Sequence, residues 1–354
     1  MKERDSKNIS GLCNDPILIT EQDWNDNVIP FVSINCITYN HEKYIKETIE
    51  GFLRQKTTFP IEILIHDDAS TDKTAEIIRE YGSKYPSLIK PIYQTENQYS
   101  KRDGTIGRIQ RNRAKGKYYT VCEGDDYWAD PLKLQKQIEY MESHPECGIT
   151  ATSAYILNDK TRKLKSLPLS NAEYRFEDFV LGNRISNLTS CTRTDLIRQY
   201  VAEIKPERRS WKSGDYPMWL YLSKVSTIKC LPFRSAVYRV LEESASHSKD
   251  SKKLLDFSRY HHSLRKFYLD YFHASDELYH KVELISYRES STLAIITKDY
   301  LLYDEIYNFY ISNGYNGLAQ FLKFKKKFPG MIKFLDLFEK VLIKIGIIKF
   351  DIKL

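Results

Sequence analysis

The chain has 354 residues, of which 42% are hydrophobic and 29% are charged, so it can form one large or two modest folded domains. Its six cysteines include no C-x-x-C pair, which argues against a disulfide framework and a structural zinc site and indicates a reducing compartment. Nearly all of the net charge of +7 lies in residues 321–354, where nine lysines accompany three acidic residues, so a basic nucleic-acid-binding domain is not expected.

The N-terminal sequence MKERDSKNIS is polar and no apolar run follows it, so no secretory signal is visible. No segment reaches the ~18 consecutive apolar residues that are needed to span a bilayer. These features predict a cytoplasmic protein.

The first 28 residues are polar and lack periodicity, so we interpret them as an N-terminal extension. Short apolar strands then alternate with amphipathic helices. The predicted strands are 31–38, 61–67, 88–94 and 117–123, and the predicted helices are 41–55, 70–85 and 131–144. Ser70 or Thr71 is expected to cap the second helix. This alternation is typical of βαβ units with a parallel sheet, and therefore of an α/β fold.

Two later segments also read as strands. Residues 147–157 form one candidate strand, and residues 227–240 resemble a late strand pair. Beyond about residue 250 the pattern changes to long helices that are rich in Tyr and Lys. We therefore predict one α/β domain at 29–250 and a helical C-terminal region at 251–354.

Polar residues follow several of the predicted strands. The acidic stretch VCEGDDYW occupies residues 121–128, and the earlier strands end in Thr38, Tyr39, Asn40, Asp67 and Asp68. Right-handed crossovers bring the carboxyl ends of such strands to one edge, where open α/β sheets bind ligands. Carboxylates at that edge can hold Mg²⁺ or Mn²⁺, which neutralises phosphate charge. A solvated turn is the alternative interpretation of the acidic stretch when it is taken alone.

Three segments together carry a family resemblance: SINCITYNHEKYIKETIEGFLRQ, IEILIHDDASTDKT and CEGDDYWADPLKLQKQ. They resemble the nucleotide-sugar-binding half of the family 2 glycosyltransferases, closely over residues 30–145 and more thinly over 185–245. The resemblance is greatest to bacterial members that build capsule, lipopolysaccharide or other surface glycans. It implies a GT-A fold, with a Rossmann-like, mostly parallel sheet flanked by helices. It also implies an inverting enzyme with a UDP-sugar or related donor, Mn²⁺ or Mg²⁺ as cofactor, and a glycan or lipid-linked acceptor.

Carried over by position, the resemblance assigns the nucleotide-sugar-binding residues as Thr38, Tyr39, Asn40, Glu42, Asp67, Asp68, Glu123, Gly124 and Asp125. Glu42 would lie near the ribose, and Asp68 would accept a hydrogen bond from the base. The family's Asp-x-Asp motif reads Glu123-x-Asp125 here, so its first carboxylate is one methylene longer. For Tyr39 and Asp67, purely structural roles at the strand end and in the turn remain open.

The metal and the general base follow from the same resemblance. Asp125 is the implied metal ligand, with Glu123, Asp126 and His247 as further candidates. His247 stands apart because Leu241 occupies the position where many relatives carry a histidine. Asp215, in RRSWKSGDYPMW, matches the acidic residue that acts as general base, with a helix-capping role as the alternative. Among the basic residues, Arg239 either contacts diphosphate or is paired, and some of Lys101, Arg102, Arg108 and Arg113 are expected to meet phosphate.

The C-terminal segment 321–354 reads as an amphipathic helix with a basic cluster at its start. Its predicted apolar face comprises Met331, Leu335, Phe338, Leu342 and Ile345, with Phe334 and Val341 beside them. A packed terminal helix and a salt-sensitive peripheral contact with the inner face of the cytoplasmic membrane are both compatible with this pattern.

Other functions fit less well. A sugar-phosphate nucleotidyltransferase would show a glycine-rich loop, but residues 31–45 contain no glycine. A metal-dependent phosphohydrolase would need more than the single His-Asp-Asp at 66–68. A non-catalytic sugar-nucleotide-binding or scaffold protein would have no need for both Asp125 and Asp215.

Overall fold

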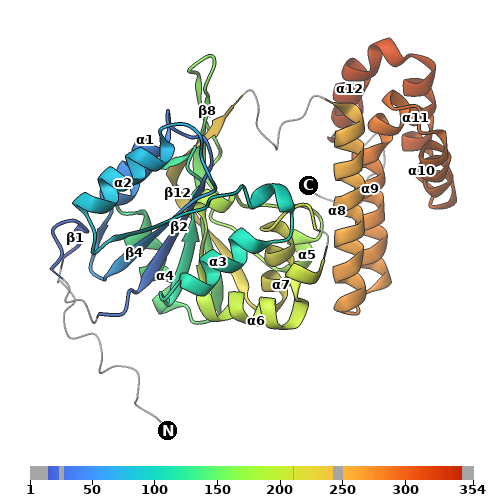
Figure 1. Cartoon of the computed structure of the whole chain (residues 1–354). Coiled ribbons are helices and arrows are strands. Elements are labelled where there is room, and N and C mark those ends of the chain that lie inside the picture. The colour runs from blue at the N-terminus through green and yellow to red at the C-terminus, as the bar shows by residue number, and fades with distance from the viewer. Residues whose placement is uncertain (1–14, 24–27, 210, 242–249, 345–354) are drawn as a thin grey trace, which may run out of the picture. The chain divides into compact units, whose positions relative to one another are not determined.

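The computed structural model describes residues 15–23, 28–209, 211–241 and 250–344. The chain divides into two compact units, Met1–Glu242 and Glu243–Leu354. The first contains a mixed α/β domain, and the second is helical (Figure 1).

The first unit is built on a ten-stranded sheet with the path order β10-β12-β8-β11-β6-β2-β4-β5, to which β7 (Tyr127–Trp128) and β9 (Leu164–Ser166) are attached. The strands along this path, in that order, are Glu173–Tyr174, Thr227–Val240, Cys147–Asn158, Cys191–Arg193, Tyr118–Val121, Val32–Thr38, Ile61–Asp67 and Ile89–Tyr93. Strands β6, β2, β4 and β5 are mutually parallel, as are β8 and β12, whereas β11 is antiparallel to both neighbours. The predicted α/β fold is therefore confirmed. The sheet is mixed rather than mostly parallel, because β10, β7, β9 and β11 all pair antiparallel with their neighbours.

Helices cover both faces of this sheet, which explains why its central strands are apolar throughout. Every residue of β4 is buried, and so are six of the seven in β2. Figure 1 shows α1 (Ile45–Leu53) and α2 (Thr74–Lys84) together on one side of β2 and β4, and α3 on the other. The remaining helices of the unit are α3 (Thr105–Arg113), α4 (Lys133–Ser143), α5 (Phe176–Phe179), α6 (Thr194–Ile204) and α7 (Tyr216–Val225).

Several local predictions differ from the structure. Helix α2 begins at Thr74, three to four residues after the expected caps, because Asp72 accepts the Thr74 N–H at 2.9 Å. The predicted strand pair at 227–240 is one long strand, β12, whose register shifts between Leu231 and Arg234 and again before Ala236. Inside the predicted N-terminal extension, β1 (Ile17–Leu18) pairs with β3 (Lys56–Thr57), and Ile19 is buried.

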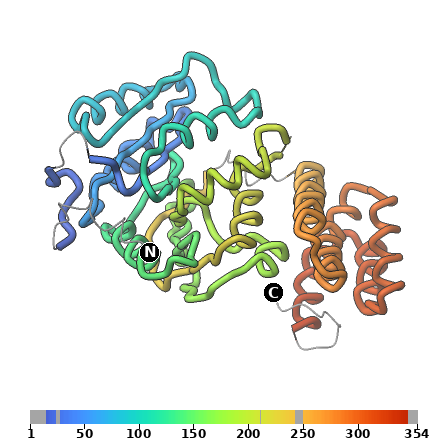
Figure 2. Tube along the Cα trace, turned by 90° about the horizontal axis from the view of Figure 1, so that it is seen from below, coloured from blue at the N-terminus to red at the C-terminus, as the bar shows by residue number. Residues whose placement is uncertain are grey.

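The second unit consists of α8 (Ser251–Tyr271), α9 (Asp276–Ile296), α10 (Tyr300–Ser312), α11 (Asn316–Lys327) and α12 (Ile332–Lys344). Side chains cap the first three, where Asp250, Ser275 and Asp299 accept backbone N–H groups. Helices α8 and α9 run side by side (Figure 2). Within the described residues, no helix is long and apolar enough to cross a bilayer.

Helix α12 packs in a different orientation from the one its sequence suggests. Its buried residues are Ile332, Leu335 and Glu339, whereas Phe338 of the predicted apolar face is 45% exposed. Lys325, expected in a surface basic cluster, is buried and pairs with Asp336 at 2.7 Å and with Glu339. An internal ion-pair network therefore fixes which side of α12 faces the other helices.

Candidate active site

The carboxyl ends of the central strands converge as the sequence predicts. Thr38 at the end of β2 is the register partner of Asp67 at the end of β4, and the Asp68 N–H donates to the Thr38 carbonyl at 2.9 Å. The acidic turn follows β6, the other neighbour of β2, and the Gly124 N–H donates to the Ile37 carbonyl at 2.9 Å. Three loops that are distant in sequence thus meet at one sheet edge.

Gly124 is required by the closeness of this approach. A Cβ atom at position 124 would lie 2.4 Å from Thr38 Oγ1 and 2.9 Å from His41 Nδ1. Thr38 is buried and hydrogen-bonds to His41 Nδ1 at 3.1 Å, so neither neighbour has room to withdraw. The acidic turn therefore lies directly against the end of β2.

Arg239 holds the acidic turn from the other side. Its N–H donates to Asp126 Oδ1 at 2.7 Å, and its Nη1 donates to the Asp125 carbonyl at 2.6 Å. The guanidinium also pairs with Glu47 and lies between two aromatic rings, 5.1 Å from the Tyr44 centroid and 4.7 Å from that of Tyr127. Of the two roles considered for Arg239, the structure shows the paired one.

The three carboxylates of the turn occupy three different environments. Asp126 is buried, and burial raises the pKa of its carboxyl well above the usual value. Burial and the neighbouring Asp125 raise the pKa of Glu123 to about 7, although Asn187 donates to it at 3.1 Å. Asp125 is only partly buried, and no group among the described residues donates to its carboxylate. Asp125 is therefore the carboxylate of the three that is most available to a ligand.

The described residues contain no cluster of three or more His, Cys, Asp and Glu side chains that could hold a metal ion. The partly exposed Asp125 carboxylate, which accepts no hydrogen bond among the described residues, is an oxygen ligand of the kind that a hydrated Mg²⁺ or Mn²⁺ takes. The Asp126 carboxylate already accepts the Arg239 N–H, so it is less available as a metal ligand. His247 lies outside the described residues.

The end of β4 contains buried polar atoms without partners. Asp67 is buried and accepts from the Ser70 N–H at 3.3 Å, but its Oδ1 has no partner among the described residues. Both ring nitrogens of the buried His66 likewise have no hydrogen-bond partner in that part of the chain, and Nε2 lies 3.9 Å from Asp68 Oδ1. Burial raises the pKa of Asp67 and lowers that of His66, so each favours its neutral form. Unsatisfied buried polar groups are costly and often indicate a ligand site.

Unlike Asp67, Asp68 has hydrogen-bond donors at both of its carboxylate oxygens. Its two oxygens accept the N–H groups of Gln98 at 2.7 Å and Tyr99 at 3.0 Å. Asp68, predicted to meet the nucleotide base, thus anchors the following loop in this structure.

Two other predicted binding residues form hydrogen bonds between the loop after β2 and the loop before α2. Asn40 has a positive φ of 54°, and its Oδ1 accepts the Thr71 N–H at 2.8 Å. Glu42 accepts the Lys73 N–H at 3.1 Å, while the Glu42 N–H donates to Asp72 at 3.0 Å. Tyr39 between these contacts is 43% exposed. Of this loop, Tyr39 is the side chain best placed to meet a ligand.

Asp215 caps α7, and its Oδ1 accepts the Tyr216 N–H at 2.8 Å. Burial raises the pKa of its carboxyl. Its charge also contributes to the raised pKa of Glu123. The helix-capping role of Asp215 is therefore present in the structure.

Three neighbours of this site were not identified from the sequence. His41 lies against Thr38, and burial lowers its pKa while Asp125 opposes that shift. Its place in TYNHE, directly after a strand, was the available signal. Asn187 and Glu47 have no local signal, because they reach the turn from a short 3₁₀ helix (Asn187–Thr189) and from α1.

Most of the basic residues that were predicted to meet phosphate form hydrogen bonds or ion pairs with nearby protein groups. Lys101 pairs with Glu96 at 3.2 Å, and Arg108 donates to Thr105 at 3.0 Å. Arg113 donates to Gln110 at 2.8 Å and to the Lys90 carbonyl. Arg102 is exposed and has a positive φ of 52°.

Comparison with known proteins agrees with this architecture. The profile of "Glycosyl transferase family 2" matches residues 33–200. An uncharacterised protein of Mycobacterium tuberculosis is 42% identical over 139 residues, which cover 39% of each chain. The match thus spans well under half the length of that relative.

TuaG of Bacillus subtilis, named for teichuronic acid biosynthesis, is 28% identical over 229 residues, or 62% of this chain and 83% of TuaG.

Solved structures show the same fold. S. aureus TarS 1–349 in complex with UDP-GlcNAc superposes with a TM-score of 0.54 at 18% identity, covering 78% of this chain and 80% of TarS 1–349. The mannosyltransferase PcManGT from Pyrobaculum calidifontis, in complex with GDP-Man and Mn²⁺, gives a TM-score of 0.51 at 12% identity, covering 90% of both chains. Residues 33–200 belong to glycosyltransferase family 2, on a GT-A fold.

Proposed function

We propose that the protein is an inverting, metal-dependent glycosyltransferase that uses a nucleotide-diphosphate sugar, with a UDP-sugar as the first candidate. The observation that carries this proposal is the arrangement at the sheet edge. Asp125, whose carboxylate accepts no hydrogen bond among the described residues, lies in the same turn as Asp126, which accepts the Arg239 N–H. The charge of Asp215 also acts on this turn, since it contributes to the raised pKa of Glu123. The UDP-GlcNAc and GDP-Man complexes of structural relatives support a nucleotide-sugar donor.

Asp125 would hold Mn²⁺ or Mg²⁺, which when bound neutralises charge on the leaving diphosphate. Glu123, held by Asn187, would face the donor as a hydrogen-bonding group. The unpartnered Asp67 Oδ1 and the exposed Tyr39 would contact the nucleotide.

Asp215 would act as the general base. Its carboxylate takes the proton from the acceptor hydroxyl as that oxygen bonds to the anomeric carbon. The bond from the anomeric carbon to the diphosphate oxygen then breaks on the opposite face, so the configuration inverts. Because burial raises the pKa of Asp215, its carboxylate is a stronger base than an exposed one.

We further propose that the acceptor is a glycan or a lipid-linked intermediate of bacterial surface polysaccharide synthesis, handled at the cytoplasmic face of the membrane. TuaG, named for teichuronic acid biosynthesis, supports this class of product. Within this class, the acceptor would be a precursor of teichuronic acid, capsule, lipopolysaccharide or a related surface glycan.

The test is a donor screen with the full chain. Nucleotide sugars are added with and without Mn²⁺, and both thermal stabilisation and slow donor hydrolysis are recorded. We expect one donor to stabilise the protein and to be hydrolysed in a Mn²⁺-dependent manner. Asp125→Ala should abolish the metal-dependent part of both signals while the protein remains folded.

Hydrolysis that persists in Asp125→Ala with EDTA present would contradict the metal role. Donor binding without any turnover in the wild-type protein would instead favour a sugar-nucleotide-binding or scaffold protein.

A further inference from the structure

Helix α12 presents two opposite faces with different chemistry. One face packs on the helical unit through Ile332, Leu335 and Glu339. The other consists of Phe334, Leu337, Phe338 and Val341, which are 59%, 64%, 45% and 45% exposed. At about 100° per residue these four fall within an arc of roughly 100°. We call this exposed apolar stripe the α12 ridge.

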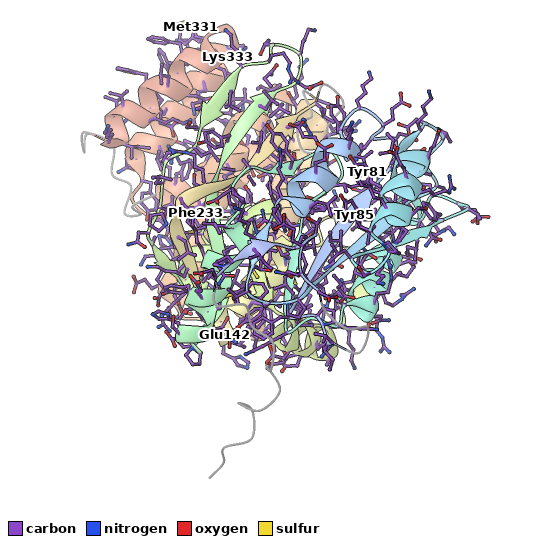
Figure 3. The ribbon with its side chains drawn as sticks, turned by 90° about the vertical axis from the view of Figure 1, so that its left-hand side faces the viewer. Tyr81, Tyr85, Glu142, Phe233, Met331 and Lys333 are labelled. Atoms are coloured by element: carbon purple, nitrogen blue, oxygen red, sulfur yellow. The ribbon has the colours of Figure 1, made fainter. Side chains whose placement is uncertain are left out.

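The ridge is continuous with neighbouring aromatic side chains. The Phe334 and Phe338 rings stack at 6.0 Å between centroids, and Phe338 lies 6.1 Å from Phe321 of α11. Met331, labelled in Figure 3 beside Lys333 at the entry to α12, is 47% exposed and extends the apolar surface. This much contiguous exposed apolar surface is typical of an interaction site.

The charges around the ridge all have one sign. Every exposed charged residue of α11 and α12 is a lysine: Lys323, Lys326, Lys327, Lys333, Lys340 and Lys344. The acidic residues of α12, Asp336 and Glu339, instead turn toward Lys325, and Glu339 also meets Arg288 at 3.4 Å. By helical periodicity, Lys333, Lys340 and Lys344 lie along one edge of the ridge.

We propose that the α12 ridge docks on an anionic lipid bilayer, with its apolar side chains in the interface and its lysines at the headgroups. An apolar stripe bordered by lysines is the pattern of a helix that lies in a membrane interface. A second copy of the chain is a poorer partner, because its lysines would repel these. The inference deepens the proposed function, on which it rests only for a membrane-associated acceptor.

The experiment measures co-sedimentation of the full chain with vesicles of phosphatidylcholine mixed with phosphatidylglycerol, and with vesicles of phosphatidylcholine alone. The ridge variant is Phe334→Gln with Leu337→Gln. Its matched control replaces exposed apolar residues elsewhere, Leu164→Gln with Ile311→Gln. The charge variant changes Lys333, Lys340 and Lys344 to Gln, and its control changes the exposed Lys163, Lys165 and Lys253 to Gln.

We expect the wild type to bind only the anionic vesicles, and more weakly as salt increases. The charge variant should lose on the order of 100-fold in partitioning, since each lysine near the surface contributes a factor of about five. The ridge variant should lose roughly tenfold or more. Both control variants should bind like the wild type.

Failure of the wild type to bind, or equal binding by the ridge variant, would overturn the proposal. If the ridge variant has a lower mass in solution than the wild type by ultracentrifugation, but binds vesicles equally well, the ridge mediates self-association instead. Vesicle binding needs no donor, so its result is separate from the donor screen. The ridge lies outside the candidate active site, so its variants should keep the wild-type rate of donor hydrolysis.

Discussion

Arg239→Gln should loosen the acidic turn while the domain remains folded. The substitution removes the Nη1 bond to the Asp125 carbonyl, the pair with Glu47 and the contacts with the Tyr44 and Tyr127 rings. A hydrogen bond to a charged group contributes about 1.5–3 kcal/mol, and each cation–π contact adds about 0.5–1 kcal/mol. The Glu47 pair adds little, because Glu47 is 47% exposed and its charge is screened. The free energy of unfolding should therefore fall by about 3 kcal/mol.

Tryptophan fluorescence during urea denaturation measures this loss in the first unit alone. The chain has four tryptophans, all before residue 243: Trp24, Trp128, Trp211 and Trp219. The control is Glu47→Gln, which removes only the half-exposed partner and should cost less than about 1 kcal/mol. In addition, Arg239→Gln should weaken Mn²⁺-dependent donor binding at low urea, where the domain is folded. Wild-type stability together with wild-type Mn²⁺ dependence would refute the view that Arg239 positions Asp125.

The remaining predictions concern one steric contact, the general base and one core lysine. Gly124→Ala places a Cβ 2.4 Å from Thr38 Oγ1, so we expect a loss of about 1–3 kcal/mol in urea denaturation; an unchanged midpoint would show that the turn can move. Asp215→Asn should leave donor affinity within a few fold and lower kcat by about 10²–10⁴ in a steady-state transfer assay, whereas collapse of donor binding would show a structural role. Lys133 is buried and its pKa is lowered to about 8, so its folded state binds fewer protons than its unfolded state between pH 8 and the usual value of 10.5. The stability of the wild type relative to Lys133→Met should therefore rise by up to about 3 kcal/mol across that window; a flat difference would contradict the shifted pKa.

The sequence was most informative where local pattern and chain topology coincide. Thr38, Asp67 and the acidic turn could be placed at one edge because each follows an apolar strand, and parallel strands align their ends. The same reasoning could not distinguish Asp125 from Asp126. What separates them is Arg239, which lies more than a hundred positions away in the chain, on β12.

The same limit explains the other differences. Asn40 and Glu42, predicted to bind the nucleotide, also bond to the loop before α2, a pairing that only the folded chain reveals. Helix α3 was not predicted, because its buried residues are only Ile106 and Gln110. Gln110 donates to the Leu64 carbonyl at 2.9 Å, so a polar residue fills one of the two buried positions. The helix therefore has no apolar periodicity to detect.

The environments of the acidic turn explain how three carboxylates coexist within four positions. Asp126 is compensated by a backbone N–H and a nearby guanidinium, so it serves the fold. For Glu123, burial and the neighbouring Asp125 raise the pKa to about 7, so its negative charge is less favoured there than in an exposed carboxylate. Asp125 is partly exposed, and its carboxylate accepts no hydrogen bond among the described residues. A cation that binds Asp125 would lower the pKa of Glu123 by opposing its negative neighbour.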